Sequence, residues 1–71
     1  MRYVAIIEKG PRSYGAYVPD LPGCVAVAKS MREVRKLIRQ AVLLHIEDLR
    51  RRGGRIPRPT TESEIVELKV A

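Results

Sequence analysis

Three short stretches near the start of the chain carry the apolar pattern of β-strands. They are rich in β-branched, aromatic and small side chains, and they span Arg2–Glu8, Tyr14–Val18 and Cys24–Ala28. Short connections separate them, which predicts an antiparallel meander of three strands. Apolar residues point to both faces of the first strand. One helix can cover only one face of this sheet, so a second molecule is a candidate cover for the other face.

The second connection has the composition of a tight turn. It contains Asp20, Leu21, Pro22 and Gly23 in succession. Pro22 fixes its own φ at a value that suits the second position of a turn, and Gly23 can adopt the positive φ that a type II turn requires next. We therefore predict that these four residues form the hairpin turn between the second and third strands.

A long amphipathic helix is predicted after the third strand. Ser30 and Glu33 have the spacing of a capping box, in which the serine hydroxyl accepts the amide N–H of the glutamate. The helical pattern ends at about Arg52, before the Gly53-Gly54 pair. One broad stripe of this helix is predicted to cover the sheet, and it contains Val34, Leu37, Ile38, Ala41, Leu44, His45 and Leu49.

Two bulky aliphatic residues of the helix, Leu43 and Ile46, do not fit the stripe. The helical period places them among arginines, on the charged side. We interpret them as part of an association surface, because solubility does not require them there. The candidate partner-contact residues are therefore Leu43, Ile46 and Arg39 on the helix, with Tyr14 and Tyr17 on the second strand.

The last stretch, Glu64–Val70, alternates in the same way as a strand. Val66, Leu68 and Val70 are separated by charged residues, which predicts a half-buried fourth strand. Because this strand follows a helical crossover, we expect it to pair parallel with one strand of the meander. The predicted fold is a single α+β domain over residues 1–71, with the element order βββαβ.

The length of 71 residues and the single cysteine, Cys24, limit how such a domain is stabilised. A chain this short buries a modest core, and oligomerisation is a common remedy. One cysteine excludes an internal disulfide, and its apolar strand favours a buried, inert thiol. We therefore expect the protein to work in a reducing cytoplasm.

We also expect no membrane span and no signal peptide. No stretch of the sequence is long and apolar enough to cross a membrane, and the first residues have the pattern of a strand.

The net charge of +6 raises the possibility of nucleic-acid binding. Four basic residues share an exposed helical face, and the candidate phosphate contacts are Arg32, Arg35, Lys36 and Arg39. Proteins that read single strands usually present aromatic platforms, however, and this chain has three tyrosines with no phenylalanine or tryptophan. We favour a solvated surface or a protein contact, and nucleic-acid binding is kept as the alternative.

The residues offer little for catalysis. Glu47 and Asp48 are adjacent on the predicted helix and therefore point in different directions, and the strands carry almost no carboxylates. The sequence contains no phosphate-binding glycine loop. His45, the only histidine, lies in the apolar stripe, which is typical of a packed imidazole. We predict no catalytic residue, no metal ligand and no cofactor.

Several of these features occur together in one known family. They are a strand with Tyr17, the sequence PDLPGC at Pro19–Cys24, the pair Leu44-His45 in the helix, the pair Gly53-Gly54, and Ile56-Pro57 with Pro59 behind it. In this combination, over nearly the whole chain, the sequence resembles the HicB antitoxin family of bacterial and archaeal toxin–antitoxin systems.

The resemblance implies a βββαβ domain similar to a truncated ribonuclease-H fold without that enzyme's catalytic carboxylates. It implies a non-enzymatic protein that binds and occludes a small HicA-type toxin, an mRNA-cleaving ribonuclease. Family members usually form dimers or tetramers, so self-association is expected. Many also carry a C-terminal DNA-binding domain, which we do not expect here. A solitary family member without a toxin partner is the remaining alternative.

Overall fold

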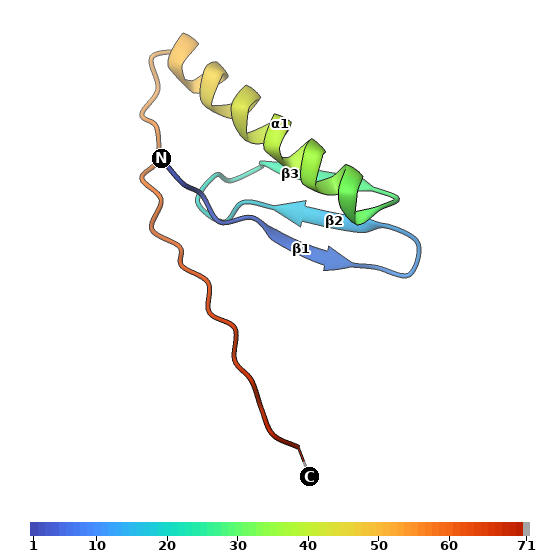
Figure 1. Ribbon diagram of the computed structural model, residues 1–71. Coiled ribbons are helices and arrows are strands. Elements are labelled where there is room, and N and C mark those ends of the chain that lie inside the picture. Colours follow the sequence, from blue (N-terminus) through green and yellow to red (C-terminus); the bar gives the residue numbers. More distant parts are fainter. Residues whose placement is uncertain (71) are drawn as a thin grey trace.

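A computed structural model describes residues 1–70 of the chain. It contains a three-stranded antiparallel sheet in the order β1-β2-β3 and one long helix. The elements are β1 (Ile6–Lys9), β2 (Tyr14–Tyr17), β3 (Val25–Ala28) and α1 (Met31–Arg51). The helix lies across one face of the sheet, and the chain after it runs back past the N-terminus and then away from the sheet (Figure 1). The predicted meander and the α+β class are confirmed.

The turn between β2 and β3 is confirmed with its boundaries one residue later than predicted. The amide of Cys24 donates to the carbonyl of Leu21 at 3.0 Å, so Pro22 and Gly23 are the two central residues. Gly23 has a φ of 83°, as the third position of a type II turn requires. The shift arises because a preceding turn, closed from Leu21 N–H to the Val18 carbonyl, brings the Leu21 side chain into the core.

The core lies between α1 and the sheet. It consists of Ala16, Val18, Leu21, Cys24, Ala28, Val34 and Ile38. Half-buried side chains pack around it, including Tyr3 and Ile7 from the start of the chain and Val42 from the helix. The small residues of β2 and β3 let α1 approach these two strands closely, and the helix packs mainly against them.

The helix begins as the capping box predicts. The hydroxyl of Ser30 accepts the amide of Glu33 at 3.1 Å and donates to its carboxylate at 3.1 Å. The predicted apolar stripe is partly wrong, however. Leu44 is 66% exposed, whereas Ile46 packs against the core. The helix has more apolar residues than its contacts with the sheet bury. The way in which α1 docks on β2 and β3 therefore decides which of them are buried.

The predicted fourth strand is not part of the sheet. Residues 54–70 form neither helix nor strand, and Glu64–Val70 lies extended and exposed. The reason lies just before it, where Tyr3 and Asp20 hold residues 57–61 across one end of the sheet. The chain then leaves the body of the molecule (Figure 1). The comparison with a ribonuclease-H fold therefore stays a prediction.

Candidate functional site

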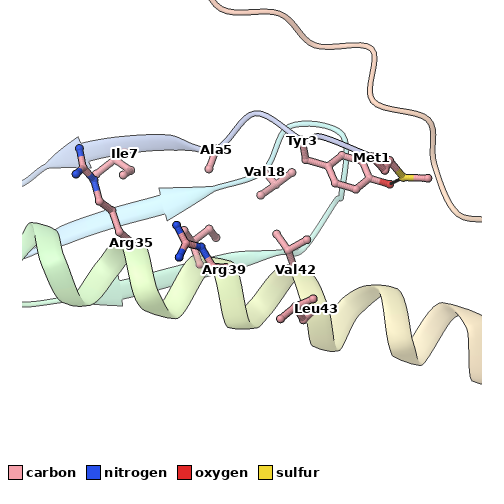
Figure 2. A pocket seen from close by; sticks show the side chains of 10 residues that line it. Met1, Tyr3, Ala5, Ile7, Val18, Arg35, Arg39, Val42 and Leu43 are labelled. Carbon is pink, nitrogen blue, oxygen red and sulfur yellow. Dashed lines mark hydrogen bonds between the residues drawn. The ribbon is translucent and has the colours of Figure 1, made fainter.

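An open apolar groove lies between the first strand and the helix. Because α1 packs mainly on β2 and β3, it covers Ile7 of β1 and the preceding Tyr3 only in part and leaves Ala5 exposed. These residues form one side of the groove, and Val42 and Leu43 of α1 form part of the other (Figure 2). The groove has a volume of about 630 Å³. We call it the β1–α1 groove.

Two arginines border the β1–α1 groove. Figure 2 shows Arg35 and Arg39 projecting from the helix, with Arg35 reaching toward Ile7. Their aliphatic stems extend the apolar surface while their guanidinium groups stay exposed. Leu43, one helical turn beyond Arg39, is 60% exposed beside them. The groove therefore combines an apolar floor with a positively charged edge, which suits an extended segment carrying apolar and acidic side chains.

The four basic residues predicted as phosphate contacts do lie together. Arg32, Arg35, Lys36 and Arg39 line a shallow depression of about 610 Å³ on the exposed side of α1. This depression shares Arg35, Arg39 and Leu43 with the β1–α1 groove. The helical period alone brings the four residues onto one face, which is why the sequence was sufficient to find them.

The face of the sheet opposite α1 is also apolar and uncovered. Tyr17 pairs with Ile6 on one side and Val25 on the other, and Val27 lies further along the same face of β3. Val25 and Val27 are 63% and 68% exposed. We call Ile6, Tyr17, Val25 and Val27 the outer sheet face. Tyr14, predicted together with Tyr17, packs against the core on the opposite face.

Asp20 has a role that the sequence did not indicate. Its carboxylate accepts the amides of Thr60 and Thr61, both at 3.0 Å, and their hydroxyls at 3.1 and 2.8 Å. These hydrogen bonds, led by that from the Thr61 amide, hold the pKa of Asp20 below its ordinary value. Nearby, the hydroxyl of Tyr3 donates to the Pro57 carbonyl. We call the four hydrogen bonds that join Asp20 to Thr60 and Thr61 the clasp. It was not apparent from the sequence because these residues lie 40 and 41 positions apart.

Cys24 and His45 are the residues whose side chains most often take part in catalysis, and each lies at a different place in the fold. The thiol of Cys24 is buried, and burial raises its pKa, so the nucleophilic thiolate is disfavoured. His45 is half-buried on α1. Across residues 1–70, histidines, cysteines and carboxylates do not gather in a group able to hold a metal ion. In the same part of the chain, α1 is too polar to cross a membrane.

These surfaces belong to a small α+β protein with exposed apolar and basic faces. The family model for the HicB-like antitoxin of bacterial toxin–antitoxin systems matches residues 3–69. The chain therefore belongs to the HicB-like antitoxin family, as its sequence motifs indicated.

Relatives support this assignment. A UPF0150 protein of Thermoplasma acidophilum is 36% identical over 63 residues, which cover 87% of this chain and 91% of the relative. A UPF0150 protein of Helicobacter pylori is 44% identical over 45 residues, covering 63% of this chain and 62% of the relative. One of Archaeoglobus fulgidus is 38% identical over 48 residues, covering 66% and 70%. No solved structure shows significant similarity to the chain.

Proposed function

We propose that this protein is a non-enzymatic antitoxin that binds and occludes a HicA-type, mRNA-cleaving ribonuclease toxin in the cytoplasm. Membership of the HicB-like antitoxin family is the observation that carries this proposal. Occlusion requires a complementary surface and no chemistry. The exposed apolar and basic surfaces of the described residues support this role.

The outer sheet face is the proposed toxin-binding surface. Tyr17, Val25 and Val27 lie on adjacent strands and expose apolar side chains that no other part of residues 1–70 covers. Contiguous apolar surface of this kind usually marks a protein interface. Tyr17 lies between two aliphatic neighbours, and tyrosine is among the residues that most often dominate the binding energy of an interface.

We further propose that the protein acts as a homo-oligomer. Its core contains few fully buried side chains, and both the outer sheet face and the β1–α1 groove leave apolar surface exposed. Burial of one of these surfaces between copies removes apolar area from water and stabilises a domain of this size. Leu43 and Arg39, predicted as partner contacts, lie at the groove and are assigned to this contact.

Co-purification tests the toxin-binding proposal. The tagged protein is co-expressed with a HicA-type toxin encoded beside it, and we expect the two to elute together. Val27→Glu places a charge on the outer sheet face and is expected to abolish co-elution. Leu44→Glu is the matched control, because Leu44 is 66% exposed, close to the 68% of Val27, but lies on the helix. Retention of toxin by Val27→Glu, or loss with both variants, contradicts this surface.

Nucleic-acid binding is the second candidate function, because four basic residues converge on one depression of α1. It predicts that the protein binds a fluorescent RNA and that the logarithm of the affinity falls with log salt by about 0.7 per phosphate contact. Arg32→Ala with Lys36→Ala should then reduce both affinity and slope. Arg50→Ala with Arg51→Ala, at the far end of the same helix, serves as the charge-matched control. Equal binding by both variants argues against this depression as the site.

A further inference from the structure

The outer edge of β1 has no strand beside it in the part of the chain that the structure describes. β1 pairs with β2 on one side only, and β2 occupies the centre of the sheet. The other backbone edge therefore offers unpaired N–H and C=O groups next to the β1–α1 groove. Exposed edges of this kind readily accept a further strand from another segment or chain. β3 is the other edge strand of the sheet, and α1 packs closely on it.

The exposed C-terminal segment has the properties of a strand without a sheet. Residues 64–70 are extended, and Ile65, Val66, Leu68 and Val70 are all highly exposed. In a strand, Val66, Leu68 and Val70 share one face because side chains alternate with a period of two. An isolated amphipathic strand is not stable in water, so this segment has a reason to pair elsewhere.

The segment and the groove match in spacing and in charge. One side of the groove presents Ile7 of β1 and, before that strand, Ala5 and Tyr3, which are alternate positions of the chain, and the segment presents three alternate apolar positions. Each set spans about 13 Å along an extended chain. On the face of the segment that carries its apolar residues, Glu64 and the preceding Glu62 add negative charge, whereas Arg35 and Arg39 border the groove. Opposite charges of this kind favour the pairing and help to set its register.

The clasp at Asp20 indicates that the segment reaches a second copy rather than its own groove. Hydrogen bonds from Thr60 and Thr61 to Asp20 fix the chain at the β2–β3 turn. From there the chain leaves the body of the molecule (Figure 1). Entry into its own groove would require the chain to turn, after Thr61, from the direction in which it leaves the body of the molecule (Figure 1). A straight extended segment instead reaches a neighbouring molecule.

We propose that residues 64–70 add as a strand to the free edge of β1 in a second copy of this chain. Val66, Leu68 and Val70 enter the β1–α1 groove of that copy, and the exchange is reciprocal, as two-fold symmetry requires. This inference rests on the self-association part of the proposed function. It assigns that self-association to the groove and leaves the outer sheet face free for the toxin.

Molecular mass in solution tests the exchange. Leu68→Glu places a charge in the apolar groove, whereas Lys69→Glu places the same side chain on the opposite face of the strand. By light scattering, the unmodified protein and Lys69→Glu are expected to be dimers and Leu68→Glu a monomer. Helical circular dichroism verifies that α1 persists in each variant. A dimeric Leu68→Glu variant, or a monomeric unmodified protein, overturns the proposal.

Crosslinking distinguishes exchange between copies from pairing within one chain. Both chains have the substitution Cys24→Ala. One chain carries Ala5→Cys, and a differently tagged chain carries Val66→Cys, Leu68→Cys or Val70→Cys. A short thiol crosslinker is expected to join the two chains when they are mixed. A third sample contains a single chain that carries both cysteines. Crosslinking within that chain, with none between the two differently tagged chains, overturns the proposal. Toxin co-purification is measured separately with Leu68→Glu, so failure of the exchange and failure of the antitoxin function give different results.

Discussion

Asp20 holds Thr61 through two hydrogen bonds, from the threonine amide at 3.0 Å and from its hydroxyl at 2.8 Å. Forty-one residues separate the two positions, so this contact links the β2–β3 turn to the segment beyond α1. Thr60 makes the same pair of contacts. The clasp therefore determines where the C-terminal segment begins its path away from the sheet.

Asp20→Asn is expected to loosen this clasp. The variant keeps one carbonyl oxygen as an acceptor but loses the charge and the second carboxylate oxygen. The amides of Thr60 and Thr61 should exchange with solvent faster, while the amides of β2 keep their protection. Hydrogen exchange followed by NMR measures both sets in one sample. Unchanged exchange at Thr60 and Thr61 would show that the clasp does not hold the segment in solution.

The clasp should also respond to acid. Its hydrogen bonds lower the pKa of Asp20 from an ordinary value of 3.8. A carboxyl whose folded pKa is lowered stabilises the folded arrangement above the unfolded pKa and loses that contribution as the pH falls through the lowered value. The amide shifts of Thr60 and Thr61 should therefore titrate together with a midpoint below 3.8. A midpoint at or above this value contradicts the assignment.

Leu21→Ala should strongly reduce the free energy of unfolding. Leu21 is only 1% exposed, so truncation leaves a cavity between the turn and α1, and such changes cost about 2–5 kcal/mol. Leu44→Ala removes the same atoms from a side chain that is 66% exposed, and a change within about 0.5 kcal/mol is expected. Chemical denaturation of both variants at one protein concentration measures the difference. Equal losses would contradict the observed packing.

Gly23→Ala tests the backbone of the turn. Gly23 has a φ of 83°, and a Cβ there meets nothing within 4 Å, so any loss of stability comes from the backbone conformation. An alanine in the left-handed region costs about 1–2 kcal/mol. Gly15→Ala in β2 is the matched control, because its Cβ also has free space and its φ is not positive. We expect that control to be neutral or slightly stabilising. The midpoint of thermal unfolding should therefore fall for Gly23→Ala and stay unchanged or rise slightly for Gly15→Ala.

Leu43→Glu should weaken self-association. Leu43 and Leu44 are adjacent and are 60% and 66% exposed, but only Leu43 lines the β1–α1 groove. The charge in Leu43→Glu would have to be buried when a strand occupies the groove, which is unfavourable. Sedimentation at a series of concentrations should show a raised dissociation constant for Leu43→Glu and little change for Leu44→Glu. The same dissociation constant for both variants would indicate that self-association uses the outer sheet face instead of the groove.

The features that were predictable from the sequence depend on neighbouring residues. The Pro22-Gly23 turn and the capping box of Ser30 and Glu33 are set by positions within three residues of each other. The gathering of Arg32 and Arg39 on one face follows from the helical period alone. Local sequence was therefore sufficient for the meander, for the start of α1 and for the basic part of the candidate site.

The remaining features depend on contacts between distant residues. The path of the C-terminal segment depends on Asp20 and Tyr3, which bond to residues 40 to 54 positions away. The β1–α1 groove exists because α1 docks on β2 and β3 and leaves Ala5 uncovered. The same docking of α1 partly buries Ile46 and leaves Leu44 exposed. Apolar alternation predicted a strand over residues 64–70, but these residues form no strand in the structure, because alternation carries no information about a pairing partner.

Toxin inhibition by the purified protein tests the central claim most directly. A HicA-type toxin is incubated with a defined mRNA, and the antitoxin is added in increasing amounts. We predict that cleavage falls in proportion to added protein and stops at a fixed molar ratio, whereas the same amount of Val27→Glu leaves it active. Undiminished cleavage in the presence of a large excess of the unmodified protein would contradict the account.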